Sequence, residues 1–284
     1  MTNFKKELEK AAKNSVRLHI GGNFEGEAGI GCTKFGGRPD VPEGFVWERF
    51  EGDDCFGEFK KRPLTFFAQF DLAEISKYDS DGLLPKTGVL SFFYDYASQP
   101  WGYDPKNKGC ARVYWFPERG ALQRADFPED LGEDYRLREF RISAQCEKSY
   151  PDYEELLIQR DPRTSPWEDF EAAAEKLGIE EPDERSKLLG FADTIQGSMP
   201  RECELISRGY YLGAGWDDIK PQDRQEAEQW GSRDWQLLLQ IDSVIDSDDF
   251  ELTFGDGGRI YFYIRRSDLA AKNFDNVWLI LQCC

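Results

Sequence analysis

The stretch "TKFGGRPDVPEGFV" (residues 33–46) has a counterpart in "SKLLGFADTIQGSM" (residues 186–199). Each contains Gly-x-x-Asp-x-x-x-Gly, with Asp40 as the aspartate of the first and Asp193 as that of the second. Glycine tolerates positive φ, and aspartate accepts hydrogen bonds from nearby backbone N–H groups, so each pattern predicts an ordered turn. Its occurrence twice predicts that the surrounding sequence is repeated as well.

The segments that follow the two stretches match in type and order. Gln69-x-Asp ends the first apolar run and Gln240-x-Asp ends its counterpart. These runs are apolar, aromatic and β-branched and have the length of strands. The matching pairs are "PLTFFAQFD" (63–71) with "DWQLLLQID" (234–242), "GVLSFFYD" (88–95) with "GRIYFYIR" (258–265), and "ARVYWF" (111–116) with "NVWLIL" (276–281). We predict an internal duplication forming two similar, largely antiparallel β-sheets whose apolar faces pack together.

The expected organisation is one compact unit over residues 1–284. Within it we assign a first repeat, an acidic helical connection and a second repeat, at 15–148, 149–187 and 188–284. Helical patterns also occur at 1–16, 221–230 and 267–274, and they predict helices around the sheets. The predicted class is therefore α+β.

The net charge of −18 argues against nucleic acid and anionic membranes as partners, because phosphate contacts require clustered lysine and arginine. The charge either keeps the protein soluble or forms an acidic face for a basic protein partner. The sequence lacks the long apolar run of a membrane-spanning helix and the apolar core of a secretion signal. Seven cysteines without a Cys-x-x-Cys pair favour reduced thiols. We expect a cytoplasmic protein.

Catalytic machinery is hard to assemble from this sequence. His19 is the only histidine, and neither a Gly-x-Ser-x-Gly elbow nor a phosphate-binding Gly-x-x-x-x-Gly-Lys-Ser/Thr loop is present. A zinc site would need closely spaced ligands that the chain does not offer. The sequence therefore predicts no catalytic residue, no cofactor and no metal.

Four polar residues recur at equivalent places in the two repeats: Asp40, Gln69, Asp193 and Gln240. If a pseudo-twofold arrangement brings them together, they could line a ligand site, and paired carboxylates could share a proton or bind a cation. The structural alternative is that each aspartate holds its own turn and each glutamine satisfies backbone groups at a strand end.

The segment "YDYASQPWGYDPKNKG" (94–109) places three aromatic residues among glycine and proline. Tyr96, Trp101 and Tyr103 could be exposed there as anchors for a protein partner, since tryptophan and tyrosine are common in interfaces. Alternatively, they cap the core of the sheet.

The chain resembles the YwqG-like family, a bacterial family of unknown function, from about residue 15 to the C-terminus. The resemblance implies a cytosolic α+β protein and supplies no catalytic residue. It is carried by "FGGRPDVPEGF" (35–45), "PLTFFAQFDLAEI" (63–75), "LPKTGVLSFFYD" (84–95), "LLGFADTIQG" (188–197), "LLLQID" (237–242) and "FGDGGRIYFYIRRSDLAAKNFDNVWLILQC" (254–283).

Three hypotheses of function follow. The first is a non-enzymatic binding module that holds a basic protein, for instance an immunity protein that neutralises a toxin, with opposite charge speeding encounter. The second is a small-ligand protein with its site between the repeats. The third is a carboxylate-based hydrolase, which would require an aspartate with a raised pKa at that site.

Overall fold

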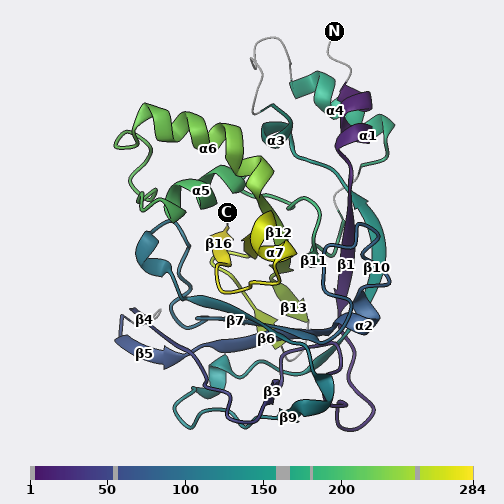
Figure 1. Ribbon diagram of the computed structural model, residues 1–284, viewed down its shortest axis with the longest axis vertical. Helices are drawn as coiled ribbons and strands as arrows, with labels where there is room; N and C mark the ends of the chain where they lie inside the picture. The colour runs from purple at the N-terminus through teal and green to yellow at the C-terminus, as the bar shows by residue number, and fades with distance from the viewer. Residues whose placement is uncertain (1–3, 54–56, 158–166, 180–181, 247–249, 284) are drawn as a thin grey trace.

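A single ten-stranded sheet dominates the computed structural model, which describes residues 4–53, 57–157, 167–179, 182–246 and 250–283 (Figure 1). Neighbouring strands in this sheet pair antiparallel. The order is β16 (Trp278–Gln282), β15 (Arg259–Arg265), β12 (Trp235–Asp242), β11 (Lys187–Leu188), β1 (Lys13–Ile20), β10 (Phe140–Ser149), β2 (Lys34–Phe35), β6 (Thr65–Asp71), β7 (Val89–Tyr94), β8 (Ala111–Phe116). The predicted α+β class with largely antiparallel strands is confirmed.

Six of these strands, β6, β7, β8, β12, β15 and β16, are the apolar runs recognised in the sequence. The expected pair of sheets is instead one continuous sheet, and the reason lies in β1 and β10. These two strands pair with each other from Lys13↔Ser149 to Ile20↔Ile142. In addition, β1 pairs with β11 and β10 pairs with β2, so the two strands join the flanking halves.

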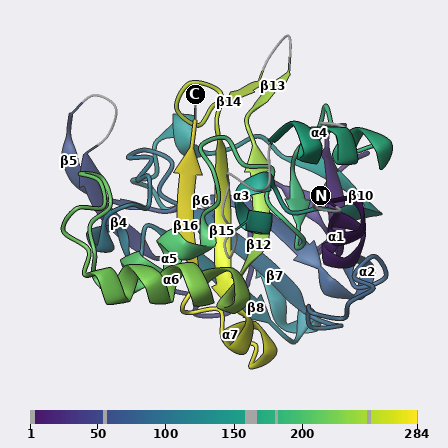
Figure 2. The ribbon, with the colours of Figure 1, turned by 90° about the horizontal axis from the view of Figure 1, so that it is seen from above.

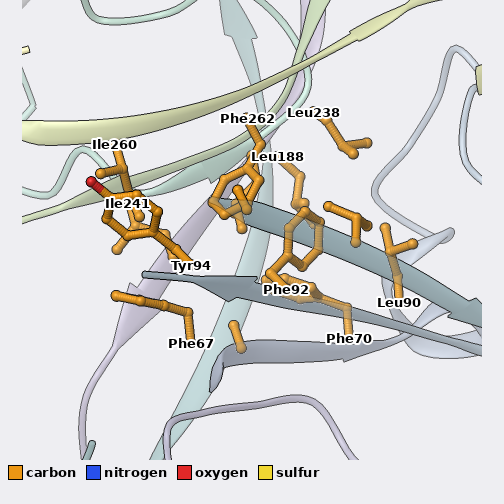
Figure 3. Packing of buried hydrophobic residues seen from close by; sticks show 14 of the residues in the cluster. Phe67, Phe70, Leu90, Phe92, Tyr94, Leu188, Leu238, Ile241, Ile260 and Phe262 are labelled. Atoms are coloured by element: carbon orange, nitrogen blue, oxygen red, sulfur yellow. The ribbon is translucent and has the colours of Figure 1, made fainter. Parts of the chain in front are cut away.

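The main core lies between the two halves of the sheet, where β12 and β15 face β6 and β7 (Figures 1 and 3). Figure 3 shows Phe262 and Leu238 from one half above Phe92 and Phe70 from the other. The rings of Phe92 and Phe262 meet edge to face with centroids 5.2 Å apart. Burying each such side chain stabilises the fold by about 1.5–3 kcal/mol, so contact between the halves is a major source of stability.

A β-bulge occurs at the same place in both halves. The register shifts between Phe66 and Ala68 in β6 and between Leu237 and Leu239 in β12. A bulge places two consecutive side chains on one face, and here Phe67 and Ala68 both enter the core. The next residue in β6, Gln69, consequently faces away from the core.

The remaining elements surround this sheet. Three two-stranded sheets pair β3 (Asp40–Pro42) with β9 (Leu122–Arg124), β4 (Arg49–Asp53) with β5 (Phe59–Pro63), and β13 (Val244–Asp246) with β14 (Phe250–Leu252). Short 3-10 turns occupy Pro105–Asn107, Arg119–Ala121 and Glu133–Tyr135. The helices are α1 (Phe4–Ala11), α2 (Leu72–Ile75), α3 (Tyr153–Leu157), α4 (Trp167–Lys176), α5 (Pro200–Ser207), α6 (Pro221–Asp234) and α7 (Arg266–Ala270).

The helices predicted at 1–16, 221–230 and 267–274 are present as α1, α6 and α7, but α7 ends at Ala270 and residues 13–16 begin β1 instead of extending the first helix. The predicted acidic connection, 149–187, contains α3 and α4, while its residues 158–166 and 180–181 lie outside the described part of the chain. Seen from above, α5 and α6 cover the outer face of β12, β15 and β16 (Figure 2). A second apolar cluster fills the space between these helices and the sheet.

Candidate functional site

The four polar residues predicted as a ligand site form two separate pairs. Asp40 N donates to Gln69 Oε1 at 3.0 Å, and Gln69 Nε2 donates to Asp40 Oδ2 at 2.6 Å. Asp193 and Gln240 repeat both bonds, at 2.9 and 3.0 Å. Four strands lie between β6 and β12, which carry the glutamines, and no hydrogen bond among the described residues links the pairs. They do not come together as one site.

Both carboxylates are occupied by groups of the protein itself. Buried Asp40 accepts Arg124 Nε at 2.5 Å and Gly31 N at 2.8 Å. Asp193 accepts Lys187 Nζ at 2.7 Å. Burial, the largest single influence, would raise the pKa of Asp193, but Lys187, Arg17 and Gln240 together hold this pKa below its ordinary value. The geometry fits the structural alternative, in which each aspartate holds its turn, and a lowered pKa does not suit the acid of a hydrolase.

Two buried lysines belong to these clusters and were not among the predicted site residues. Lys34 lies opposite Gln69 in the sheet register, and Lys187 lies opposite Gln240. Lys34 Nζ donates to Glu139 Oε2 at 2.7 Å. The sequence does contain a signal for these lysines, because each is the second residue of a Gly-x-x-Asp stretch (33–46 or 186–199).

The aromatic loop divides between the two interpretations. Tyr96 packs on the main core and its hydroxyl donates to Thr253 O at 3.3 Å, so it caps the sheet. Tyr103 packs on the second cluster, and burial raises its pKa above the ordinary value. Trp101 is 46% exposed, while its backbone carbonyl accepts Leu281 N at 3.0 Å on edge strand β16. Of these three aromatic side chains, Trp101 alone is exposed.

The outer faces of the two halves differ in chemistry. In the first half, Phe45 follows Gly44 and packs on Tyr114 and Phe93, with ring centroids 5.1 and 6.0 Å away. At the matching place of the second half a serine follows Gly197, and the nearby Glu202 Oε2 is buried without a hydrogen-bond partner among the described residues. Burial raises the pKa of Glu202 to about 7. The second half therefore carries buried polar groups where the first half is aromatic.

Next to these polar groups lies a cavity of about 510 Å³. It is formed where the end of α1, the start of β1, α3, the loop after β11, the end of α6 and the start of α7 meet. Half of its lining is apolar and half is charged. The lining residues are Ala11, Lys13, Pro151, Glu155, Leu156, Phe191, Arg233 and Arg266.

Lys13 is the half-buried cation of this cavity. Its Nζ lies 3.6 Å from the centroid of the Phe191 ring, and it forms no ion pair with any described residue. Burial lowers the pKa of Lys13 to about 8, the Arg266 charge lowers it further, and the Glu155 charge opposes the shift. Contact with the aromatic ring compensates only part of the cost of burying the ammonium charge. A negatively charged ligand group would therefore be favourable next to Lys13.

The other charged groups of the cavity differ in exposure. Arg233 and Arg266 are exposed at its rim, and neither has an acidic partner among the described residues. Burial raises the pKa of Glu155 to about 7, and the neighbouring Asp152 charge adds to the rise. Near neutral pH the cavity therefore carries three cationic side chains against one partly protonated carboxyl group.

A second cavity, of about 400 Å³, opens between the two halves of the chain. Its lining mixes charges, but Arg265 is already paired with Glu204 at 2.7 Å. None of the four predicted ligand-binding residues lines it. The lining residues are Pro105, Lys108, Gly109, Arg112, Ile206, Ser207, Gly209, Trp235, Arg265, Asp268, Asp275, Asn276, Val277 and Trp278.

Across the described ranges, no three histidine, cysteine, aspartate or glutamate side chains are grouped as metal ligands. No helix in the same ranges has the length and apolar character needed to cross a membrane.

Comparison with known proteins places the chain in a family without assigning an activity. No curated protein matches the sequence. Residues 33–283 match the family described as "Domain of unknown function (DUF1963)", which covers both Gly-x-x-Asp stretches and every strand of the main sheet except β1. The chain belongs to this family.

Proposed function

We propose that the protein binds a small anionic molecule with an apolar part, in the cavity lined by Lys13 and Glu155. The observation that carries the proposal is the set of cations around this cavity. Three cationic side chains, for which the described residues supply no ion-pair partner, surround it in a protein whose net charge is −18. An acidic protein that gathers unpaired cations at one cavity offers an anion a local attraction that the rest of its surface does not.

The dimensions and lining suit a small molecule. A volume of about 510 Å³ lies in the usual range for ligand pockets, which combine apolar walls with a few polar groups. Leu156 and Phe191 would contact the apolar part of the ligand. Arg233 and Arg266 would receive its carboxylate or phosphate, because a guanidinium binds either group through two hydrogen bonds.

Binding is tested with three probes of one shape: phenylacetate, phenyl phosphate and uncharged benzyl alcohol. We expect one or both anions to bind in titration calorimetry and benzyl alcohol not to bind. Arg233→Gln combined with Arg266→Gln should weaken anion binding roughly tenfold or more, because a hydrogen bond to a charged group contributes about 1.5–3 kcal/mol. Arg224→Gln, on α6 and outside the cavity, is the matched control. Equal binding by all variants, or no binding of either anion, would refute the proposal.

A protein partner is the second candidate, and exposed Trp101 favours it. The Leu281–Trp101 backbone bond fixes this loop against β16, so the indole is presented from an ordered segment. A basic partner would be attracted by the net charge. For any partner identified, Trp101→Ala should raise the dissociation constant, whereas the arginine substitutions at the cavity should leave it unchanged.

We also propose that the two halves arose by duplication, and that each copy contributes one strand to the other. By this interpretation β1 of the first copy pairs with β11 of the second, and β10 of the second copy pairs with β2 of the first. Lys34↔Gln69 and Lys187↔Gln240 are paired in the same register, and both neighbouring strands carry the same bulge. If β10 is the counterpart of β1, each strand has its counterpart at the same position counted from the opposite edge of the sheet. The second repeat would then begin at β10. A relative that carries one half and dimerises through the equivalent strands would be the expected ancestor.

A cytoplasmic location and membership of the YwqG-like branch complete the proposal. The five described cysteines, Cys32, Cys110, Cys146, Cys203 and Cys283, are free thiols, as expected in a reducing compartment. Fractionation of the host cell tests the location.

A further inference from the structure

We infer that Lys13 is a nucleophilic amine that forms an imine with a carbonyl group of the ligand. The inference rests on the proposed function, because it places the carbonyl of an anionic aldehyde or keto acid beside Lys13. It adds a covalent step to what the cavity does.

The geometry around Lys13 separates it from the other buried lysines. Lys34 and Lys187 each donate to a carboxylate at 2.7 Å. Lys13 Nζ instead faces the Phe191 ring and the cavity, and no described residue forms an ion pair with it. Its position at the start of β1, paired with Ser149, fixes the backbone from which the amine reaches the cavity.

The electrostatic surroundings support an uncharged amine. Burial lowers the pKa of Lys13 and so does Arg266, whereas Glu155 and Asp81 raise it. Exposed Arg233 adds a further cation to the same cavity. With a pKa of about 8, about a tenth of the Lys13 amines are neutral at pH 7, against fewer than one in a thousand for an exposed lysine. Desolvation and a neighbouring cation are the two usual means of activating a lysine.

The step balances as amine plus carbonyl giving imine plus water. The Nζ lone pair attacks the carbonyl carbon and forms a carbinolamine. A proton then passes to the carbinolamine hydroxyl, the C–O bond breaks, and water leaves as the C=N bond forms and nitrogen loses its second proton. Glu155 lines the same cavity and holds a proton near neutral pH, so it can donate to the leaving hydroxyl and recover a proton from nitrogen. No oxidant or reductant is needed.

The test is reductive trapping on the full-length protein with glyoxylate and cyanoborohydride. Peptide mass spectrometry then measures the carboxymethyl adduct on each lysine. We expect Lys13 to be labelled roughly tenfold faster at pH 7 than exposed Lys10 on α1, because far more of its amine is neutral. Acetaldehyde, which lacks the carboxylate, should show less preference for Lys13.

Two substitutions move the pH profile in opposite directions. Arg266→Gln removes a charge that lowers the pKa of Lys13, so the midpoint of the labelling rate should rise. Glu155→Gln removes a charge that raises this pKa, so the midpoint should fall. Lys13→Arg should abolish the adduct, and circular dichroism reports whether each variant is folded. A merely structural lysine would not produce paired shifts of opposite sign.

The outcomes separate the two proposals. Labelling of Lys13 no faster than that of Lys10, or an unshifted profile in both variants, overturns the inference. If phenylacetate or phenyl phosphate still binds in that case, the proposed function stands without covalent chemistry. If neither anion binds but Lys13 is still labelled selectively, Lys13 is a reactive amine and the proposal of an anion-binding site is refuted.

Discussion

Glu202 offers a direct test of the buried polar groups on the second half. Its Oε2 is buried without a hydrogen-bond partner among the described residues, and burial raises its pKa from 4.5 to about 7. The folded protein therefore holds this proton more tightly than the unfolded chain does. It follows that folding stability decreases as the pH rises from about 4.5 through 7.

The expected size comes from the shift itself. A rise from 4.5 to about 7 corresponds to at most about 3 kcal/mol of lost stability once both states are ionised. Glu202→Gln keeps the shape and removes the charge, so we expect it to stabilise the protein by about 1–3 kcal/mol at pH 8. The gain should fade as the pH falls toward about 4, where most of the carboxyl groups are protonated in both states.

Glu204 is the matched control on the same helix. Burial alone would raise its pKa, but bonds from Trp235 Nε1, Arg208 and Arg265 at 2.7–2.9 Å hold the pKa below its ordinary value. Glu204→Gln should therefore destabilise the protein at pH 8, by about 1.5–3 kcal/mol, because the Glu204 carboxylate is buried and loses charged hydrogen bonds from two partly exposed arginines. Urea unfolding at pH 5 and pH 8 measures both variants. If Glu202→Gln destabilises the protein at pH 8, or leaves the pH dependence unchanged, the assignment is refuted.

Other substitutions test the core, the paired polar clusters and the cavity. Gln69→Leu and Gln240→Leu should each cost about 2–4 kcal/mol, because each leaves a buried aspartate N–H and a backbone carbonyl unpaired; a loss below about 1 kcal/mol in urea unfolding would contradict the structural role. Phe92→Ala and Phe262→Ala should each cost about 3–5 kcal/mol, and a double-mutant cycle should give a coupling of about 0.5–1.5 kcal/mol. Additive losses would mean that the two halves do not pack through these rings. Anion affinity measured by calorimetry should fall as the pH rises through about 8, because Lys13 loses its proton there; constant affinity would exclude Lys13 from the anion site.

The sequence predicted the strands of each half because their signal is local. Runs such as 65–71 and 259–265 are rich in aromatic and β-branched residues and are buried on both faces. The joining strand β10 was not predicted. Its side chains alternate between half-buried and exposed over most of "FRISAQCEKS", and it is held by backbone pairing with β1 and β2 instead of by an apolar pattern. Together with β1, whose first residues (13–16) were predicted as helix, this strand joins the two halves into one sheet.

The candidate cavity could not be predicted for a different reason. Lys13, Glu155, Phe191, Arg233 and Arg266 come from five places in the chain, and no spacing links them. In contrast, the paired glutamines and aspartates were visible because they are repeated in order. Repetition, however, marks what both halves need for folding. The residues of the cavity have no counterparts in a repeated pattern, so the sequence carries no signal for them.

The central position of β1 constrains how the protein is made. Its ladder partners are β10 and β11, and Ile20 and Phe140 are 120 positions apart in the sequence. At about 5–20 residues per second, a ribosome needs roughly 10 s to make that interval. During this time the edges of β1 have no native strand to pair with, and Val16 and Leu18 have no complete core to enter. A nascent chain or fragment that ends before residue 140 therefore carries an exposed apolar strand that a chaperone can bind.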